Sequence, residues 1–194
     1  MNSSGREIEI KLAARDVRTA QKWLRAGGFR AYRRRVFESN IVFDLPDGAL
    51  RGQARLLRVR QAGTRSILTY KGPPDPGPHK SREELETGFD NPVAIRAILD
   101  RLGYRPVFTY EKYRTEYRQP GQKGIATIDE TPIGAYIELE GSPAWIDRTA
   151  RKLGFSQDDY ILDSYGRLYL RWVESRGLRP GDMVFAQHSR QRLR

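Results

Sequence analysis

The sequence contains no cysteine, only two histidines and no long apolar run. Without cysteine the chain has no disulfide framework, thiol nucleophile, iron–sulfur cluster or zinc finger. The histidines, His79 and His188, lie far apart in the sequence, which argues against a multi-histidine metal site. No apolar stretch approaches the ~20 residues of a membrane span, and the N-terminus lacks an apolar signal region. We therefore expect a cytoplasmic protein.

What the sequence does contain is enough apolar material for one folded domain and a large excess of positive charge. Hydrophobic residues make up 38% of the 194 residues and aromatic residues 10%, which is sufficient for a core. Lysine and arginine number 35 against 24 acidic residues, a net charge of +11. Such an excess indicates a polyanionic partner: nucleic acid, an acidic membrane surface or a phosphate-rich ligand.

The positive excess lies at the two ends of the chain. Residues 1–35 hold ten basic and three acidic residues, and residues 171–194 hold six and two. The long middle, residues 36–170, is balanced at 19 of each sign. A nucleic-acid-binding face is expected to carry an unbalanced stripe, so this balance does not favour a nucleic-acid partner.

Alternating charged and apolar residues predict about eight strands joined by short turns. The predicted strands cover residues 6–12, 29–45, 56–60, 66–71, 80–86, 108–117, 125–129 and 135–140. Helices are predicted over about 16–26, 92–102, 142–153 and 164–176. This pattern favours an α+β protein in which helices surround a closed antiparallel barrel or a strongly curved sheet. We expect one domain over residues 1–176 and a loosely ordered basic tail over 177–194.

Most of the predicted strands carry both acids and bases on their polar face. The acids are Glu7, Glu9, Glu84, Glu86, Asp129, Glu138 and Glu140, and the bases are Lys11, Arg58, Arg60, Lys71, Arg82, Lys112 and Arg114. Facing inward, they would line a tunnel whose charges need partners, water or a charged ligand. Arginine and lysine donate to phosphate oxygens, whereas carboxylates hold Mg²⁺ or Mn²⁺. The alternative is an exposed face of cross-strand salt bridges, each worth about 0–1 kcal/mol.

In chain order these motifs resemble the CYTH family, also called triphosphate tunnel metalloenzymes. That family contains class IV adenylate cyclases, thiamine triphosphatases and inorganic triphosphatases. The resemblance rests on Glu7-x-Glu9-x-Lys11, Arg58-x-Arg60, Lys71, Arg82-x-Glu84-x-Glu86, Lys112-x-Arg114, Asp129, Glu138-x-Glu140 and Ser164-Tyr165. The matches run from residue 7 to residue 165 and so cover most of the chain.

The resemblance implies a closed eight-stranded antiparallel β-barrel, open at both ends, with peripheral helices and a bound triphosphate. The phosphate-binding residues would be Lys11, Arg58, Arg60, Lys71, Arg82, Lys112 and Arg114. The ligands of Mg²⁺ or Mn²⁺ would be Glu7, Glu9, Glu86, Asp129, Glu138 and Glu140. Glu7, Glu9 and Lys11 are the predicted catalytic residues; Lys11 would either donate to phosphate or help to activate water.

The leading functional hypothesis is metal-dependent hydrolysis of inorganic, nucleoside or thiamine triphosphate. The first alternative is a class IV-type adenylate cyclase that converts ATP to cyclic AMP and pyrophosphate, because residues 102–112 resemble bacterial cyclase-like members. The second is a non-catalytic polyphosphate- or RNA-binding module, which would gain nothing from seven inward carboxylates. We expect His79 and His188 to be exposed and without a role, and Tyr165 to pack the last helix or to touch substrate.

Overall fold

The computed structural model describes residues 5–186, which form eight β-strands, five α-helices and one 3₁₀ helix. The strands are β1 (Gly5–Ala14), β2 (Arg30–Asp44), β3 (Leu56–Ala62), β4 (Arg65–Lys71), β5 (Lys80–Phe89), β6 (Arg105–Arg118), β7 (Ile125–Thr131) and β8 (Gly134–Glu140). The helices are α1 (Val17–Ala26), α2 (Ala49–Gly52), α3 (Pro92–Arg101), α4 (Pro143–Lys152), the 3₁₀ helix η1 (Gln157–Asp159) and α5 (Tyr165–Glu174).

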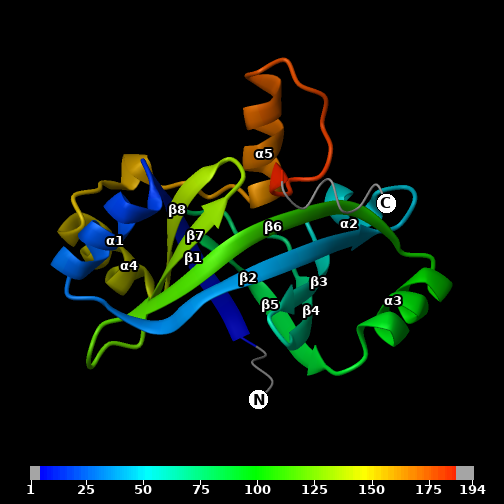
Figure 1. Cartoon of the computed structure of the whole chain (residues 1–194), viewed down its shortest axis with the longest axis horizontal. Helices are drawn as coiled ribbons and strands as arrows, with labels where there is room; N and C mark the ends of the chain where they lie inside the picture. Colours follow the sequence, from blue (N-terminus) through cyan, green and yellow to red (C-terminus); the bar gives the residue numbers. More distant parts are fainter. Residues whose placement is uncertain (1–4, 187–194) are drawn as a thin grey trace.

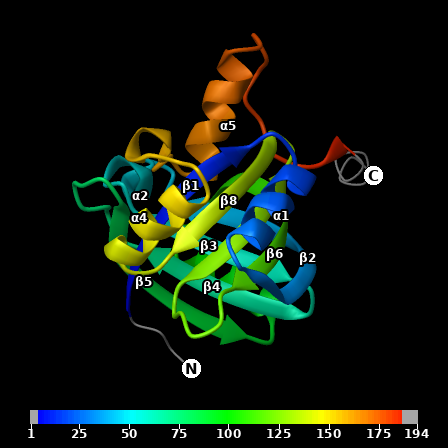
Figure 2. The ribbon, with the colours of Figure 1, turned by 90° about the vertical axis from the view of Figure 1, so that its left-hand side faces the viewer.

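The strands close into a barrel in the order β1-β5-β4-β3-β2-β6-β7-β8, and β8 pairs with β1. Every neighbouring pair is antiparallel, and the short connections make hairpins of β3–β4, β6–β7 and β7–β8. Figures 1 and 2 show the helices on the outside of this barrel. The predicted α+β fold with an eight-stranded closed barrel and peripheral helices is therefore confirmed.

Side-chain caps fix where the longer helices begin. Asp16 accepts a hydrogen bond from the backbone N–H of Thr19, and Ser142 accepts one from Trp145. Pro143 occupies the first turn of α4, where its missing N–H costs no hydrogen bond. The predicted helix starts at 16 and 142 are thus confirmed to within a residue.

The hydrophobic core lies outside the barrel wall rather than within it. The outward-facing residues Ile10, Leu12 and Ile137 are fully buried against α1 and α4. A second cluster packs α3 against the β2–β3 side through Leu99, Phe43 and neighbouring side chains. Because the apolar faces of β1, β7 and β8 pack against α1 and α4, their opposite, charged faces are directed to the barrel interior. Among the described residues, no helix is long and apolar enough to cross a membrane.

The chain after α5 returns to the barrel and lies along β6 (Figure 1). Met183 is 1% exposed, and its backbone bonds to Thr109 and Glu111 on β6. The expectation of a loosely ordered tail is therefore wrong for residues 182–185, because a buried side chain and backbone hydrogen bonds hold this segment. Residues 187–194 of that tail, with His188, lie outside the described residues.

Candidate active site in the barrel interior

The barrel interior gathers the residues that the sequence singles out. Period-two alternation places them on the inner face of seven strands, and Lys11, Arg58, Lys71, Arg82, Lys112, Asp129 and Glu138 are all buried. Most of them occur as acid–base contacts, not as separate acidic and basic patches. This arrangement satisfies the requirement that charges removed from water be paired.

The first group of contacts surrounds the two glutamates of β1. The Lys71 ammonium donates to both carboxylate oxygens of Glu7 at 2.6 Å, and Arg82 Nε donates to Glu7 at 3.3 Å. Glu9 accepts from Lys80 at 2.7 Å and from Lys11 at 3.2 Å. The strands that supply these bases follow from the barrel closure, since β1 pairs with β5 and β5 pairs with β4.

The second group surrounds Asp129 on β7, which is fully buried. Its carboxylate accepts from Lys112 at 2.8 Å, from Arg114 at 2.7 and 2.6 Å, and from the Tyr165 hydroxyl at 2.7 Å. Arg114 also donates to Glu138 on β8. Asp129 thereby fixes the direction of two cationic side chains and one tyrosine.

The third group lies around Arg58 on β3. Its guanidinium donates to the Tyr110 hydroxyl at 3.0 Å, to Thr69 at 3.1 Å and to Glu86 at 3.3 Å. The Arg58 Nε is buried and has no hydrogen-bond partner among the described residues. Nearby, Arg60 Nε donates to the side-chain oxygen of Asn40 at 3.1 Å.

The pKa shifts in the interior follow from burial opposed by these contacts. Burial alone would raise the pKa of Glu9, but Lys11, Lys80 and Lys71 hold it well below its usual range. Burial alone would lower the pKa of Lys11, but the carboxylates of Glu9 and Glu138 raise it. Lys11 is therefore a cation at neutral pH, as a phosphate-binding donor must be.

Where carboxyl groups lie close together, their repulsion raises the pKa of a carboxyl group instead of lowering it. Burial of its carboxyl group and the carboxylates of Glu7 and Glu9 raise the pKa of Glu140 to about 7, although the residue is exposed at the end of β8. Burial, with Glu7 and Glu86 nearby, raises the pKa of Glu84 to about 7 as well. Carboxyl groups that repel one another in this way suit a bound cation.

The carboxylate oxygens of the interior are the kind of ligand that a hard divalent cation prefers. Glu9 and Glu140 are directly opposite each other on β1 and β8, and Glu138 lies opposite Lys11. Within residues 5–186, no three or more acidic or histidine side chains are already gathered as a metal site. Mg²⁺ commonly uses one or two carboxylates and takes its remaining ligands from water and substrate phosphates. One or two of these glutamates would therefore suffice as protein ligands.

The interior also contains residues that are not among the predicted site residues. Glu38 and Asn40 on β2 are buried among the predicted bases, and Lys80 is bound to Glu9. Glu38 Oε2 lies 3.6 Å from both Arg60 and Lys112, with no hydrogen-bond partner among the described residues. The sequence does carry a signal for Glu38 and Asn40, because they alternate with Phe37, Ser39 and Ile41 and therefore share one face of the strand.

Tyr165 lies in the interior and also packs the last helix. Its ring is 5.2 Å from the ammonium of Lys11 and 5.1 Å from that of Lys112. It is buried together with Tyr110 and Met183. The hydroxyl contact with Asp129 makes Tyr165 part of the charged network rather than only a packing residue.

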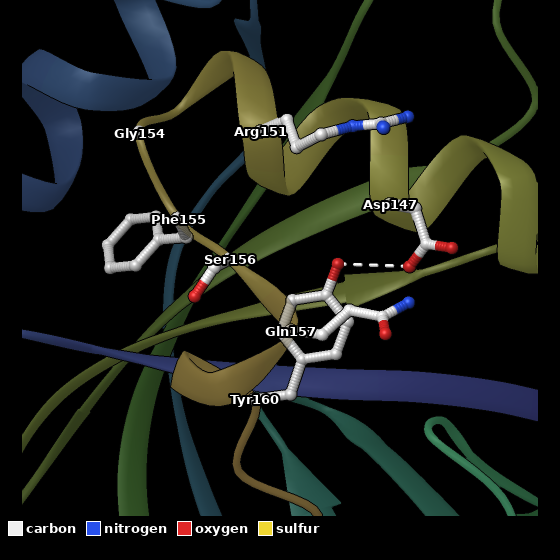
Figure 3. A pocket seen from close by; sticks show the side chains of 7 residues that line it. All are labelled: Asp147, Arg151, Gly154, Phe155, Ser156, Gln157 and Tyr160. Atoms are coloured by element: carbon white, nitrogen blue, oxygen red, sulfur yellow. Dashed lines mark hydrogen bonds between the residues drawn. The ribbon is translucent and has the colours of Figure 1, made fainter.

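A separate surface pocket lies outside the barrel interior, between α4 and η1 (Figure 3). Its lining includes Asp147, Arg151 and Tyr160, and the Tyr160 hydroxyl donates to Asp147 at 3.0 Å. Asp147 also contacts His79 Nε2 at 2.7 Å, and His79 is 8% exposed. The expectation that His79 is exposed is wrong, because its ring is buried at the contact with Asp147, which joins the loop before β5 to α4.

Comparisons with known proteins agree with the fold. Residues 5–165 match the family described as the CYTH domain. A Methanocaldococcus jannaschii protein named "putative adenylate cyclase" is 29% identical over 183 residues, covering 89% of this chain and 99% of its own length. The structure of the PH1819 protein from Pyrococcus horikoshii is similar with a TM-score of 0.72 at 25% identity, covering 85% of this chain and 98% of that one.

A third similar protein is a structure from Hippeastrum with a TM-score of 0.60 at 18% identity, covering 90% of this chain and 97% of that one. That structure is described as a "putative adenylyl cyclase" that reveals a dominant triphosphatase activity. At this level of identity the likeness concerns the fold.

Proposed function

The chain belongs to the CYTH domain family, and on this premise we propose that it hydrolyses a triphosphate inside the barrel with the help of Mg²⁺ or Mn²⁺. The observation that supports this proposal is the lining itself. Cationic donors for phosphate and carboxylates for a divalent cation alternate around one interior and contact one another. A site for phosphate alone would need only the donors.

The phosphate chain would be bound by the bases of the interior. In this proposal they are Lys11, Arg58, Arg60, Lys71, Arg82, Lys112 and Arg114. The carboxylates that contact these lysine and arginine side chains hold them in place before a ligand arrives. Little reorganisation is therefore needed when negative charge develops on the transferred phosphoryl group. Arg58 offers the clearest donor, because its buried Nε has no partner among the described residues.

The protein ligands of the cation would come from Glu7, Glu9, Glu138 and Glu140, and the family resemblance adds Glu86 and Asp129 as further candidates. When bound, it supplies charge neutralisation at the phosphate oxygens and lowers the pKa of a coordinated water. Glu7 and Glu9 also orient Lys71, Arg82, Lys80 and Lys11 through their hydrogen bonds. Lys11 would donate to phosphate.

Adenylate cyclase activity is the second candidate, favoured by the name of the Methanocaldococcus jannaschii relative. The same interior would bind the triphosphate of ATP, and the ribose 3′-hydroxyl would replace water as the nucleophile. Hydrolysis remains our first proposal, because the charged lining accounts for the binding of a triphosphate and a cation and needs no adenine site. A cyclase would also have to recognise adenine.

One assay distinguishes these functions. The protein is incubated with Mg²⁺ or Mn²⁺ and, in separate reactions, with inorganic triphosphate, ATP or thiamine triphosphate. Orthophosphate, pyrophosphate and cyclic AMP are then resolved. We expect metal-dependent release of orthophosphate. Cyclic AMP with stoichiometric pyrophosphate would establish the cyclase instead, and binding without any product would indicate the non-catalytic module.

The variant Glu7→Gln tests the site assignment. We expect it to abolish turnover while the fold is retained, because the neutral amide no longer holds Lys71 and Arg82 or a cation. Glu83→Gln is the matched control, since Glu83 is exposed on β5 between the inward-facing positions Arg82 and Glu84. Full activity of Glu7→Gln would contradict the assignment.

A further inference from the structure

The segment 181–186, here named the C-terminal strap, pairs with a part of β6 that β7 does not cover. Strand β7 pairs with β6 only over Tyr113–Arg118. Further along β6, the strap bonds to the same edge: Met183 N–H donates to Thr109 O, and Glu111 N–H donates to Met183 O, both at 2.9 Å. The strap therefore satisfies backbone groups that the short β7–β8 hairpin does not reach.

Side chains secure the strap at both ends. The carboxylate of Asp182 accepts from the backbone N–H of Thr109 at 2.7 Å. The carboxylate of Glu111 accepts from the backbone N–H of Phe185 at 3.0 Å, and the Phe185 ring packs on Tyr113 with centroids 5.2 Å apart. These contacts fix the register of the strap on β6.

Between these ends Met183 packs behind two tyrosines of the interior. Met183 is 1% exposed and forms one buried cluster with Tyr110 and Tyr165. The Tyr110 hydroxyl accepts from Arg58, and the Tyr165 hydroxyl donates to Asp129. Tyr110 thus lies between Met183 and Arg58, and Tyr165 lies between Met183 and Asp129.

We propose that the C-terminal strap positions the triphosphate-binding groups: Met183 holds Tyr110, and Tyr110 holds the Arg58 guanidinium toward the phosphate chain. This inference depends on the proposed function, in which Arg58 binds phosphate. Met183 is a positioning residue, because it acts through Tyr110 and does not itself reach the ligand.

The barrel does not need the strap in order to close. The ladder from β1 round to β8 is complete without residues 181–186, and the family match ends at residue 165. Loss of strap packing should therefore affect the position of Tyr110 more than the integrity of the barrel.

The test measures the binding of inorganic triphosphate by calorimetry with Mg²⁺ present, together with KM and kcat for its hydrolysis. For Met183→Ala we expect about tenfold weaker binding, equivalent to ~1.4 kcal/mol, and a raised KM with kcat unchanged. Met183→Leu, which conserves volume, should restore the wild-type affinity. Leu178→Ala is the control, because Leu178 follows α5 and is 51% exposed.

Two further variants keep the result interpretable. Asp182→Ala removes the exposed anchor of the strap and should weaken binding in the same direction, even if Met183→Ala fails to fold. In a Tyr110→Phe background, Met183→Ala should weaken triphosphate binding little further, because the hydrogen bond from Arg58 to the Tyr110 hydroxyl is already absent.

The outcomes separate the two proposals. Wild-type protein that does not bind triphosphate would overturn the proposed function. Wild-type protein that binds, with Met183→Ala and Asp182→Ala binding equally well, would overturn the role of the strap. Equal and additive losses from Met183→Ala with and without Tyr110→Phe would also overturn it.

Discussion

Replacing Glu38 with glutamine should destabilise the protein in a pH-dependent manner. The carboxylate is buried, at 5% exposure, and lies 3.6 Å from both Arg60 and Lys112. Burial alone would raise the pKa of Glu38, but Arg60, Lys112, Arg114 and Arg58 outweigh it and lower the pKa to about 2. Glu38→Gln keeps the shape of the side chain and removes only its charge.

The size of the effect follows from the difference between the folded and unfolded pKa. The ordinary value is 4.5 and the folded value is about 2; at about 1.36 kcal/mol for each pKa unit this amounts to ~3 kcal/mol at neutral pH. Because the folded pKa is lowered, this stability is fully present above about 4.5 and is lost as the pH falls through about 2. The deficit of the variant should therefore shrink to ~1 kcal/mol at pH 3.

Urea unfolding of the wild type and Glu38→Gln at pH 7 and pH 3 measures this deficit directly. Glu83→Gln, exposed on β5, is the control for removing one carboxylate without a buried partner. An equal deficit at both pH values would show that the loss comes from packing and not from ionisation. No deficit at pH 7 would refute the electrostatic reasoning altogether.

Two further predictions concern the framework around the site. His79→Ala should lower the free energy of unfolding by ~1 kcal/mol, because it removes the contact with Asp147. Limited proteolysis should then cut the loop before β5 faster. Unchanged cleavage would show that this contact does not hold the loop. Gly124→Ala should lower the stability by ~2 kcal/mol, because an added Cβ would lie 2.3 Å from the Trp145 ring. Thermal unfolding measures the second loss against Gly52→Ala, where nothing lies within 4 Å; equal melting temperatures would count against the tight packing.

Much of the fold could be predicted because alternation and capping are local properties of the chain. The period-two pattern of residues 6–12 determines which side chains of β1 share a face. Asp16 and Ser142 cap the helices whose starts they predict. The same alternation gave the inner face of β3, β5, β6 and β8, so the predicted site residues lie on one surface.

The contacts within that surface were not predictable from the residues alone. Glu7 binds Lys71, 64 positions away, because β5 lies between their strands in the closed barrel. The partners of Glu38 and Lys80 follow from closure of the barrel, which places Lys112 opposite Glu38 and Glu9 opposite Lys80. Register and closure are long-range properties, and no local pattern encodes them.

The strap and His79 show the same limit in segments without periodicity. Residues 177–186 read as a basic, irregular tail, yet an uncovered stretch of β6 and a buried position for Met183 hold residues 182–185. His79 follows a loop rich in proline and glycine and becomes buried because Asp147 lies opposite it on α4. In both cases the partner surface, not the segment, decides the structure.

The sequence by itself determined the equal supply of acids and bases on the polar face of the strands, since alternation requires no knowledge of the fold. The tertiary structure alone decided which acid holds which base and which donors stay without a partner. The physical reason is that a charge removed from water must find its partner in space, and the closure of the barrel chooses that partner.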